Sequence, residues 1–298
     1  MQEFKVCGIQ IAPKPNDIKY NVEKICHWAR KAYDSFQPQL MVFPETITTG
    51  YAPGMSVDEF YELVEPIPGP TTEIIEKLSR ELNAYMVIPT YEKGKQPNII
   101  YNSSVLIGPS EGIIGAYRKT HLFPLERLEG GGWSTAGTEA PVFDIKYARI
   151  GMIICYDGDF PELSRELAIL GAEVIVRPSA LMRSYDIWSL TNHARAYDNH
   201  VYIVGVNAVG PDAVGNYYFG NSMIVSPIAQ KLAQARGTEE MIAYTLSPEP
   251  LKYVSYGTNS PMIFDHLEDR NIGVYKNILK EGKCSFEPFK RIPYKKAP

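Results

Sequence analysis

The 298-residue sequence has few cysteines and no excess of positive charge, and these shortages exclude several classes of protein. Its four cysteines stand far apart, without a C-x-x-C pair or a histidine at zinc-ligand spacing, which argues against a disulfide framework and a structural metal. The formal net charge of −4 favours neither nucleic acid nor an anionic membrane as a partner. No apolar run reaches the length of a membrane span. We therefore expect no nucleic-acid partner and no membrane partner.

The first residues also lack the architecture of a signal peptide, because residues 1–5 lead directly into a strand-like run. We therefore expect a cytoplasmic location. What is present is ordinary for a globular protein, with 45% hydrophobic and 21% charged residues. A chain of this length can bury a substantial core.

Apolar spacing along the chain predicts strands interleaved with helices. A strand over 4–11 is followed by a helical apolar face that runs to Phe36. Crossovers then mix with hairpins, a pattern that predicts mixed sheets with helices packed outside, an α/β layered fold. We expect further strands at 40–43, 84–91, 101–107, 113–118, 150–154, 173–176, 201–206 and 223–225, a closing hairpin of 230–235 with 241–246, and helices at about 72–82, 161–170 and 184–199.

Three segments do not show this patterning. Residues 46–70 and 120–140 read as long connections, and loops of that length tend to be functional. Residues 247–298 are interrupted by six prolines. We expect a single domain over 1–298, of which 247–298 form a largely irregular C-terminal extension.

The stretch 149–162 combines a buried strand, a cysteine and the start of a helix. Its apolar run, 150–154, is typical of a strand covered on both faces, and Pro161 is suited to the first turn of a helix. Cys155 thus falls at the carboxyl end of a strand, where sheets with helical connections usually keep their chemistry. Cysteine is also a common small core residue, so this stretch alone leaves a nucleophile and a packing residue both open.

Two further ionisable residues, Glu45 and Lys119, also stand at the ends of predicted strands. A carboxylate can take the proton of an attacking thiol and return it to a leaving group. An ammonium, together with the backbone N–H of Tyr156 at the turn after Cys155, can stabilise the oxyanion formed when a carbonyl is attacked. Taken singly, the glutamate could be a surface carboxylate and the lysine a solvated strand end.

The motifs around these three residues resemble those of the nitrilase, or carbon–nitrogen hydrolase, superfamily. They are Val-Phe-Pro-Glu at 42–45, Tyr-Arg-Lys-Thr-His-Leu-Phe-Pro at 117–124 and Gly-Met-Ile-Ile-Cys-Tyr-Asp at 151–157, in family order over nearly the whole chain. The resemblance implies a four-layer α-β-β-α sandwich and assembly as a homodimer or a higher homo-oligomer. It implies neither a metal nor an organic cofactor.

The resemblance also implies a mechanism that matches the chemistry of the residues. Glu45 takes the thiol proton, Cys155 attacks the carbonyl of a small-molecule amide with help from Lys119, and water then hydrolyses the thioester. The family's second glutamate falls on Glu126, which would orient the lysine or the substrate amide.

The residues after the nucleophile indicate an amidase. True nitrilases typically carry tryptophan and glutamate there, whereas this chain has Tyr156-Asp157. We therefore expect cleavage of a small linear amide to a carboxylic acid and ammonia, with Tyr156 and Tyr51 among the substrate-binding residues. Arg177, or Arg183 nearby, could contact a polar or anionic part of the substrate; alternatively, Arg177 pairs with an acidic neighbour.

Other functions remain open at this point. Enzymes that cleave N-carbamoyl amino acids can place arginines just after the cysteine, where this chain has Gly158-Asp159, but an N-carbamoyl amide (ureido) hydrolase remains the main alternative. A catalytically inactive, partner-binding scaffold or an acyl-transfer domain is an alternative of a different class. The intact Glu45, Lys119 and Cys155 argue against a dead scaffold.

Overall fold

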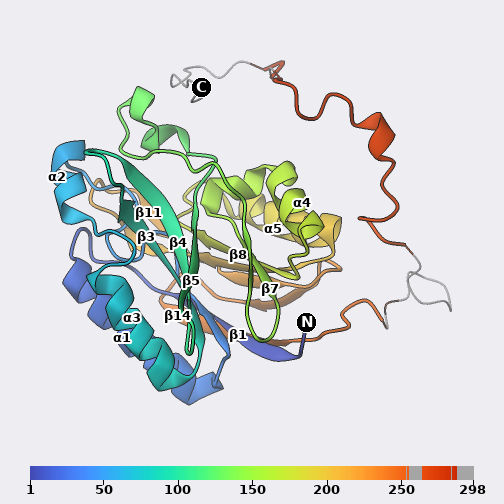
Figure 1. Ribbon diagram of the computed structural model, residues 1–298, viewed down its shortest axis with the longest axis horizontal. Helices are drawn as coiled ribbons and strands as arrows, with labels where there is room; N and C mark the ends of the chain where they lie inside the picture. The colour runs from blue at the N-terminus through green and yellow to red at the C-terminus, as the bar shows by residue number, and fades with distance from the viewer. Residues whose placement is uncertain (253, 255–263, 283, 287–298) are drawn as a thin grey trace.

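The structure is a computed structural model that describes residues 1–252, 254, 264–282 and 284–286 (Figure 1). Two six-stranded sheets lie face to face, and a pair of helices covers the outer face of each. This arrangement confirms the predicted α/β fold with a four-layer α-β-β-α sandwich.

The first sheet has the order β14-β1-β2-β3-β4-β5. Next to one edge, β1 (Phe4–Gln10) pairs in parallel with β2 (Leu40–Val42) and antiparallel with the edge strand β14 (Glu240–Leu246). The remaining members are β3 (Tyr85–Lys93), β4 (Ile100–Gly108) and β5 (Gly112–Arg118), and the covering helices are α1 (Ile18–Phe36) and α3 (Pro70–Leu82).

The second sheet has the order β13-β12-β9-β8-β7-β6. Its three central strands, β7 (Arg149–Met152), β8 (Val174–Ser179) and β9 (Tyr202–Asn207), are parallel and joined through helices α4 (Pro161–Ile169) and α5 (Tyr185–Asn199). The edge strands are β6 (Val142–Asp144) and β13 (Lys231–Gln234), and β12 (Met223–Val225) lies between β13 and β9. A small separate ribbon joins β10 (Val209–Pro211) to β11 (Tyr217–Phe219).

The alternation of side chains along β1 divides the core into two parts. Phe4 and Val6 point toward the second sheet and join a cluster that continues to α4 and α5. Cys7 and Ile9 point the other way, into a second cluster under α1 and α3. A strand that is apolar on both faces is what a buried sheet between two layers requires.

Two predictions from the sequence were wrong. The connection 46–70 contains a helix, α2 (Val57–Leu63), whose Ser56–Glu59 capping box was overlooked because Phe60 is its only buried residue. The segments 230–235 and 241–246 do not pair with each other. β13 pairs with β12 at the edge of the second sheet, whereas β14 pairs with β1 at the edge of the first sheet.

Beyond β14, the described residues contain one short 3-10 helix, η4 (Ile272–Val274). This segment runs along the outside of the sandwich near α4 (Figure 1), where Arg165 Nη1 donates to the His266 carbonyl at 3.0 Å. Residues 253, 255–263, 283 and 287–298 of the predicted extension lie outside the described residues. Within the described ranges, no helix is long and apolar enough to cross a membrane.

The close approach of the two sheets at Gly8 generates a stability prediction. A Cβ there would lie 3.0 Å from Val206 Cγ2 and 3.3 Å from Ile242 Cγ1. Gly8→Val should therefore overpack the core and lower the free energy of unfolding by about 1–3 kcal/mol, measured by urea denaturation. Gly282→Val is the control, because nothing lies within 4 Å of a Cβ at that glycine. Equal stability of the two variants would contradict this account of the interface between the sheets.

Candidate active site

Glu45 follows β2 and is only 1% exposed, with both carboxylate oxygens held in place. Oε1 accepts from Asn102 Nδ2 at 2.7 Å and from Lys119 Nζ at 2.8 Å. Oε2 accepts from the backbone N–H of Ala180 at 2.7 Å. Each sheet thus supplies donors to this carboxylate, and its direction is fixed.

Lys119 lies immediately after β5 and is completely buried between two carboxylates. Its Nζ is 2.8 Å from Glu45 Oε1 and 2.7 Å from Glu126 Oε1. Burial opposes the charge on Lys119, but Glu126 and Glu45 outweigh it, and together they raise the pKa of the lysine. The ammonium is therefore retained at neutral pH.

Glu126 stands on the 3-10 helix η1 (Pro124–Glu126), within the predicted loop 120–140. Its Oε1 also accepts from the backbone N–H of Phe123 at 2.9 Å. Its Oε2 is buried and has no hydrogen-bond partner within the described part of the chain. Burial, opposed in part by Lys119, raises the pKa of Glu126. The free oxygen is available to a group that enters the site.

Cys155 begins η3 (Cys155–Asp159), the turn between β7 and α4. Its φ of +47° lies in the left-handed region, which a residue with a side chain adopts only where its surroundings enforce it. Burial raises the pKa of the Cys155 thiol to about 12. The Glu45 carboxylate adds to this increase in the pKa, whereas Lys119 and Arg177 oppose it. The thiol in this site is protonated at neutral pH and needs a base before it can attack.

Asp157 holds this turn in place, a role that the sequence did not reveal. Its buried carboxylate accepts from the Ile154 N–H at 2.9 Å, the Tyr117 hydroxyl at 2.7 Å and the His121 N–H at 2.9 Å. Asp157 therefore connects the nucleophile turn to the end of β5. Lys119 is the residue that follows β5. In the sequence, Asp157 indicates an amidase but does not indicate these contacts.

A small hollow opens beside Cys155 and Ala180. Its volume is only about 10 Å³, roughly the space of one water molecule. Tyr51 is 2% exposed and forms part of the wall, with its ring 5.5 Å from Lys119 Nζ. The Tyr51 hydroxyl is buried and, among the described residues, has no hydrogen-bond partner. The other lining residues are Phe123, Leu181, Met182 and Arg183.

The predicted substrate contact of Arg177 is not supported by this geometry. The side chain is completely buried behind the turn, where Nε and Nη2 donate to the Cys155 carbonyl at 3.0 and 2.8 Å. Its carboxylate neighbour, Asp159, is 3.6 Å away and forms a tighter, two-pronged pair with Arg183. The helix α5 covers this end of β8, and its residues Thr191 and Asn192 accept hydrogen bonds from Arg177. Arg183, by contrast, does line the hollow.

The Tyr156 side chain lies at the edge of the hollow rather than inside it. Its ring packs edge-on against Phe123 at 5.4 Å and faces the Arg183 guanidinium at 5.5 Å. Asn102 was missed altogether, although an amide within an otherwise strand-forming run on β4 is the available signal. The structure thus brings Glu45, Lys119, Glu126 and Cys155 into one electrostatically coupled cluster.

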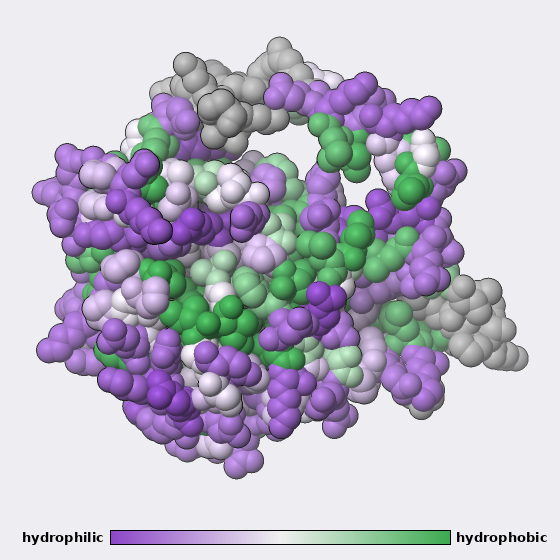
Figure 2. Space-filling model, viewed as in Figure 1, coloured by the Kyte–Doolittle hydropathy of each residue, from purple (hydrophilic) through white to green (hydrophobic). Residues whose placement is uncertain are grey.

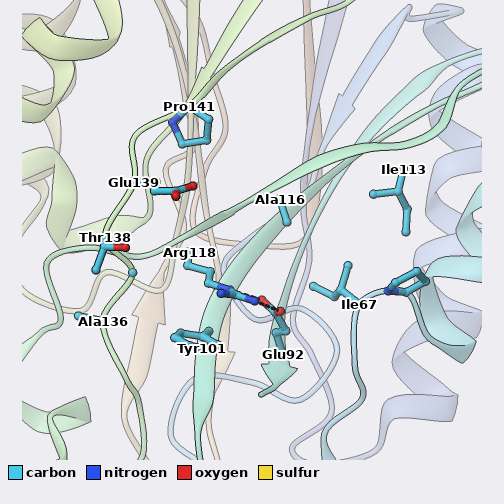
Figure 3. A pocket seen from close by; sticks show the side chains of 12 residues that line it. Ile67, Glu92, Tyr101, Ile113, Ala116, Arg118, Ala136, Thr138, Glu139 and Pro141 are labelled. Atoms are coloured by element: carbon cyan, nitrogen blue, oxygen red, sulfur yellow. Dashed lines mark hydrogen bonds and ion pairs between the residues drawn. The ribbon is translucent and has the colours of Figure 1, made fainter. Parts of the chain in front are cut away.

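A much larger hollow, of about 600 Å³, lies on the outer side of the first sheet and contains none of these four residues. Figure 3 shows Glu92 and Arg118 pointing toward each other in it, and their two-pronged ion pair includes a 2.9 Å contact at Nε. The Arg118 guanidinium also stacks 4.0 Å from the Tyr101 ring. Its arginine and its buried glutamate are already paired with each other, so size alone does not make it the site of chemistry.

Comparison with known proteins gives the same family as the motifs. Residues 5–251 match the carbon–nitrogen hydrolase family. A nitrilase of Pyrococcus abyssi is 36% identical over 242 residues, which cover 80% of this chain and 87% of that protein. An (R)-stereoselective amidase of a Pseudomonas species is 33% identical over 273 residues, covering 90% of this chain and 92% of the relative. The solved structure of a Nesterenkonia AN1 amidase is 21% identical and superposes with a TM-score of 0.76 over 93% of this chain and 97% of that one.

The chain therefore belongs to the carbon–nitrogen hydrolase family. Within this family it is an enzyme of the amidase type. No group of histidine, cysteine, aspartate and glutamate side chains suited to a metal ion occurs in the described ranges.

The cluster generates a prediction about the thiol. Because the Glu45 carboxylate raises the pKa of Cys155, Glu45→Gln should shift thiolate formation to lower pH. The ultraviolet absorbance of the thiolate is followed against pH, and the absorbance of Cys155→Ala is subtracted. The difference gives the pH midpoint of thiolate formation at Cys155. Glu92→Gln is the control, because that buried carboxylate pairs with Arg118 outside the cluster. An unchanged midpoint in Glu45→Gln would contradict the electrostatic coupling.

Proposed function

We propose that this amidase hydrolyses a small linear amide to a carboxylic acid and ammonia through a thioester on Cys155. The observation that carries the proposal is the fixed Glu45 carboxylate, whose donor Ala180 lines the same hollow as the Cys155 thiol. A protonated thiol beside an oriented base is the arrangement that nucleophilic catalysis by cysteine requires.

The first half of the reaction forms the acyl-enzyme. Glu45 takes the thiol proton as Sγ of Cys155 bonds to the amide carbon, and the carbonyl oxygen becomes an oxyanion. The Lys119 ammonium and the Tyr156 N–H stabilise that oxyanion. When the carbon–nitrogen bond breaks, the nitrogen takes the proton back from Glu45 and leaves as ammonia.

The second half releases the acid. Glu45 removes a proton from water, and the resulting hydroxide attacks the thioester carbon. The carbon–sulfur bond then breaks, and the sulfur regains the proton from Glu45. Glu126 holds Lys119 with Oε1 and has Oε2 free to accept a hydrogen bond from the substrate amide.

The size and lining of the hollow favour a small acyl group. The hollow has a volume of about 10 Å³, and most of its lining is apolar or aromatic. An N-carbamoyl amino acid would need a free cation for its carboxylate, but Arg183 is engaged by Asp159. We therefore favour a neutral amide over the ureido alternative.

We also propose that copies of the chain assemble as a homodimer or a larger homo-oligomer. Ile169 on α4 and Leu190 on α5 are 53% and 68% exposed. Figure 2 shows apolar surface across the middle of this face of the molecule, extending toward the C-terminal segment. Contiguous apolar surface of this kind is typical of protein–protein contacts.

The central test measures ammonia release from short aliphatic amides, ω-amides of dicarboxylates, N-carbamoyl amino acids and nitriles. We expect turnover of at least one short amide, and a loss of about 10⁴-fold or more in Cys155→Ala because the nucleophile is gone. Cys26→Ala is the matched control, since that half-buried cysteine packs against the cluster beneath α1. Intact mass after rapid quenching should show an acyl adduct on Cys155.

The other outcomes are equally informative. Turnover confined to nitriles would contradict the amide assignment, and turnover confined to N-carbamoyl compounds would favour the ureido alternative. An absence of both turnover and adduct on every compound would favour a scaffold.

The buried Tyr51 hydroxyl generates a second prediction. If it hydrogen-bonds the substrate, Tyr51→Phe should lower kcat/KM about 10-fold, the worth of one hydrogen bond of about 1–1.5 kcal/mol. Tyr85→Phe removes a hydroxyl that bonds Glu111 on the first sheet and should leave kcat/KM unchanged. Equal values for wild type and Tyr51→Phe would show that the hydroxyl does not bind substrate.

A further inference from the structure

Arg177 is a completely buried cation behind the nucleophile turn, on a strand where packing alone would favour an apolar residue. The ion-pair contact of Arg177 with Asp159 is 3.6 Å long, so this buried charge also needs compensating hydrogen bonds. Nη1 donates to Thr191 Oγ1 at 2.7 Å and to Asn192 Oδ1 at 3.0 Å. Burial lowers the pKa of Arg177 to about 10, which leaves the guanidinium charged at neutral pH.

The other side of the guanidinium is directed at a single peptide group. Both Nε and Nη2 donate to the Cys155 carbonyl, at 3.0 and 2.8 Å. That carbonyl and the Tyr156 N–H are the two ends of the same amide. A charged, two-pronged donor on the oxygen withdraws electron density and makes the N–H a stronger donor. In the described part of the chain, no hydrogen bond uses the Tyr156 N–H.

We infer that Arg177 is a positioning residue, which orients and polarises the peptide between Cys155 and Tyr156 so that its N–H binds the oxyanion. This inference rests on the proposed thioester mechanism, in which the same N–H receives the developing negative charge. The hydrogen bonds of Arg177 reach the Cys155 carbonyl, Thr191 and Asn192. Its effect passes through the backbone of the nucleophile.

The turn is shaped to let the guanidinium reach this carbonyl. A Cβ on Gly158 would lie 2.1 Å from Arg177 Cζ and 2.2 Å from Nε, so only glycine leaves space there. The left-handed φ of Cys155 presents the carbonyl to the arginine at the beginning of η3. The conformation of Cys155 and the absence of a side chain at Gly158 are thus both required for the contact of Arg177 with the Cys155 carbonyl.

A second guanidinium provides a matched comparison. Arg195 on α5 donates to the Gly158 carbonyl at 3.1 Å and to the Asp159 carbonyl at 3.2 Å. It holds the far end of η3 but does not bind the peptide that contains the Tyr156 N–H. If both arginines only stabilised the turn, substituting either one should affect catalysis equally. If Arg177 polarises the peptide, substituting Arg177 should lower kcat more.

The experiment compares Arg177→Lys with Arg195→Lys on the best amide found for the wild type. Lysine keeps the charge but cannot donate two parallel hydrogen bonds. Removing an oxyanion donor costs about 10²–10³ in kcat, so weakening one should lower kcat at least 10-fold in Arg177→Lys, with KM within about 3-fold. Arg195→Lys should lose less than about 3-fold in kcat.

A second readout separates polarisation from folding. An aldehyde analogue of the substrate adds to a cysteine thiol and forms a tetrahedral hemithioacetal that mimics the oxyanion. Its inhibition constant should rise in Arg177→Lys by about the factor by which kcat falls, and should stay constant in Arg195→Lys. Thermal unfolding of both variants controls for stability. If Arg177→Lys does not fold, Gly158→Ala displaces the guanidinium instead and should show the same pattern.

Equal losses in the two lysine variants, or an unchanged aldehyde affinity in Arg177→Lys, would overturn the inference while leaving the amidase mechanism intact. A wild type that neither hydrolyses an amide nor forms an acyl adduct would overturn the proposed function, and the inference with it.

Discussion

The site depends on the burial of one positive charge between two negative ones. Lys119 has no contact with solvent, and its ammonium lies within 2.8 Å of Glu45 and within 2.7 Å of Glu126. Moving any one of these charges would leave another unpaired in a medium that stabilises it poorly. The end of β2, the end of β5 and the helix η1 must therefore meet at one point. The same requirement fixes the carboxylate that acts as the base.

The nucleophile is held by a second set of constraints that come from both sheets. Asp157 connects the turn to the end of β5 through Tyr117, and Arg177 connects it to β8. Cys155 keeps a left-handed backbone because these contacts leave it no alternative. The cysteine and its base thus stand on separate sheets, and the packing between those sheets sets their relative position.

Much of the fold and of the site could be predicted from the sequence. The features that could not be predicted depend on tertiary contacts. The α/β layers follow from apolar periodicity, and the motifs around Glu45, Lys119 and Cys155 carry enough local pattern to be recognised. The partner of β14 could not be predicted, because β14 pairs with β1, the first strand of the chain, and not with β13, its neighbour in sequence. The burial of Arg177, which disfavours the predicted contact with substrate, could not be predicted for a related reason. Position along a strand does not tell which helix will cover the strand end, and here α5 covers it.

The fit of Arg177 beneath Gly158 also bears on how relatives of this chain can diverge. A side chain at 158 and a guanidinium at 177 cannot occupy the same volume, so neither position can drift while the other stays fixed. An enzyme that acquires a larger residue after its nucleophile must first give up the arginine, and one that acquires the arginine must already have glycine there. These two positions, nineteen residues apart, should therefore change as a pair across the family.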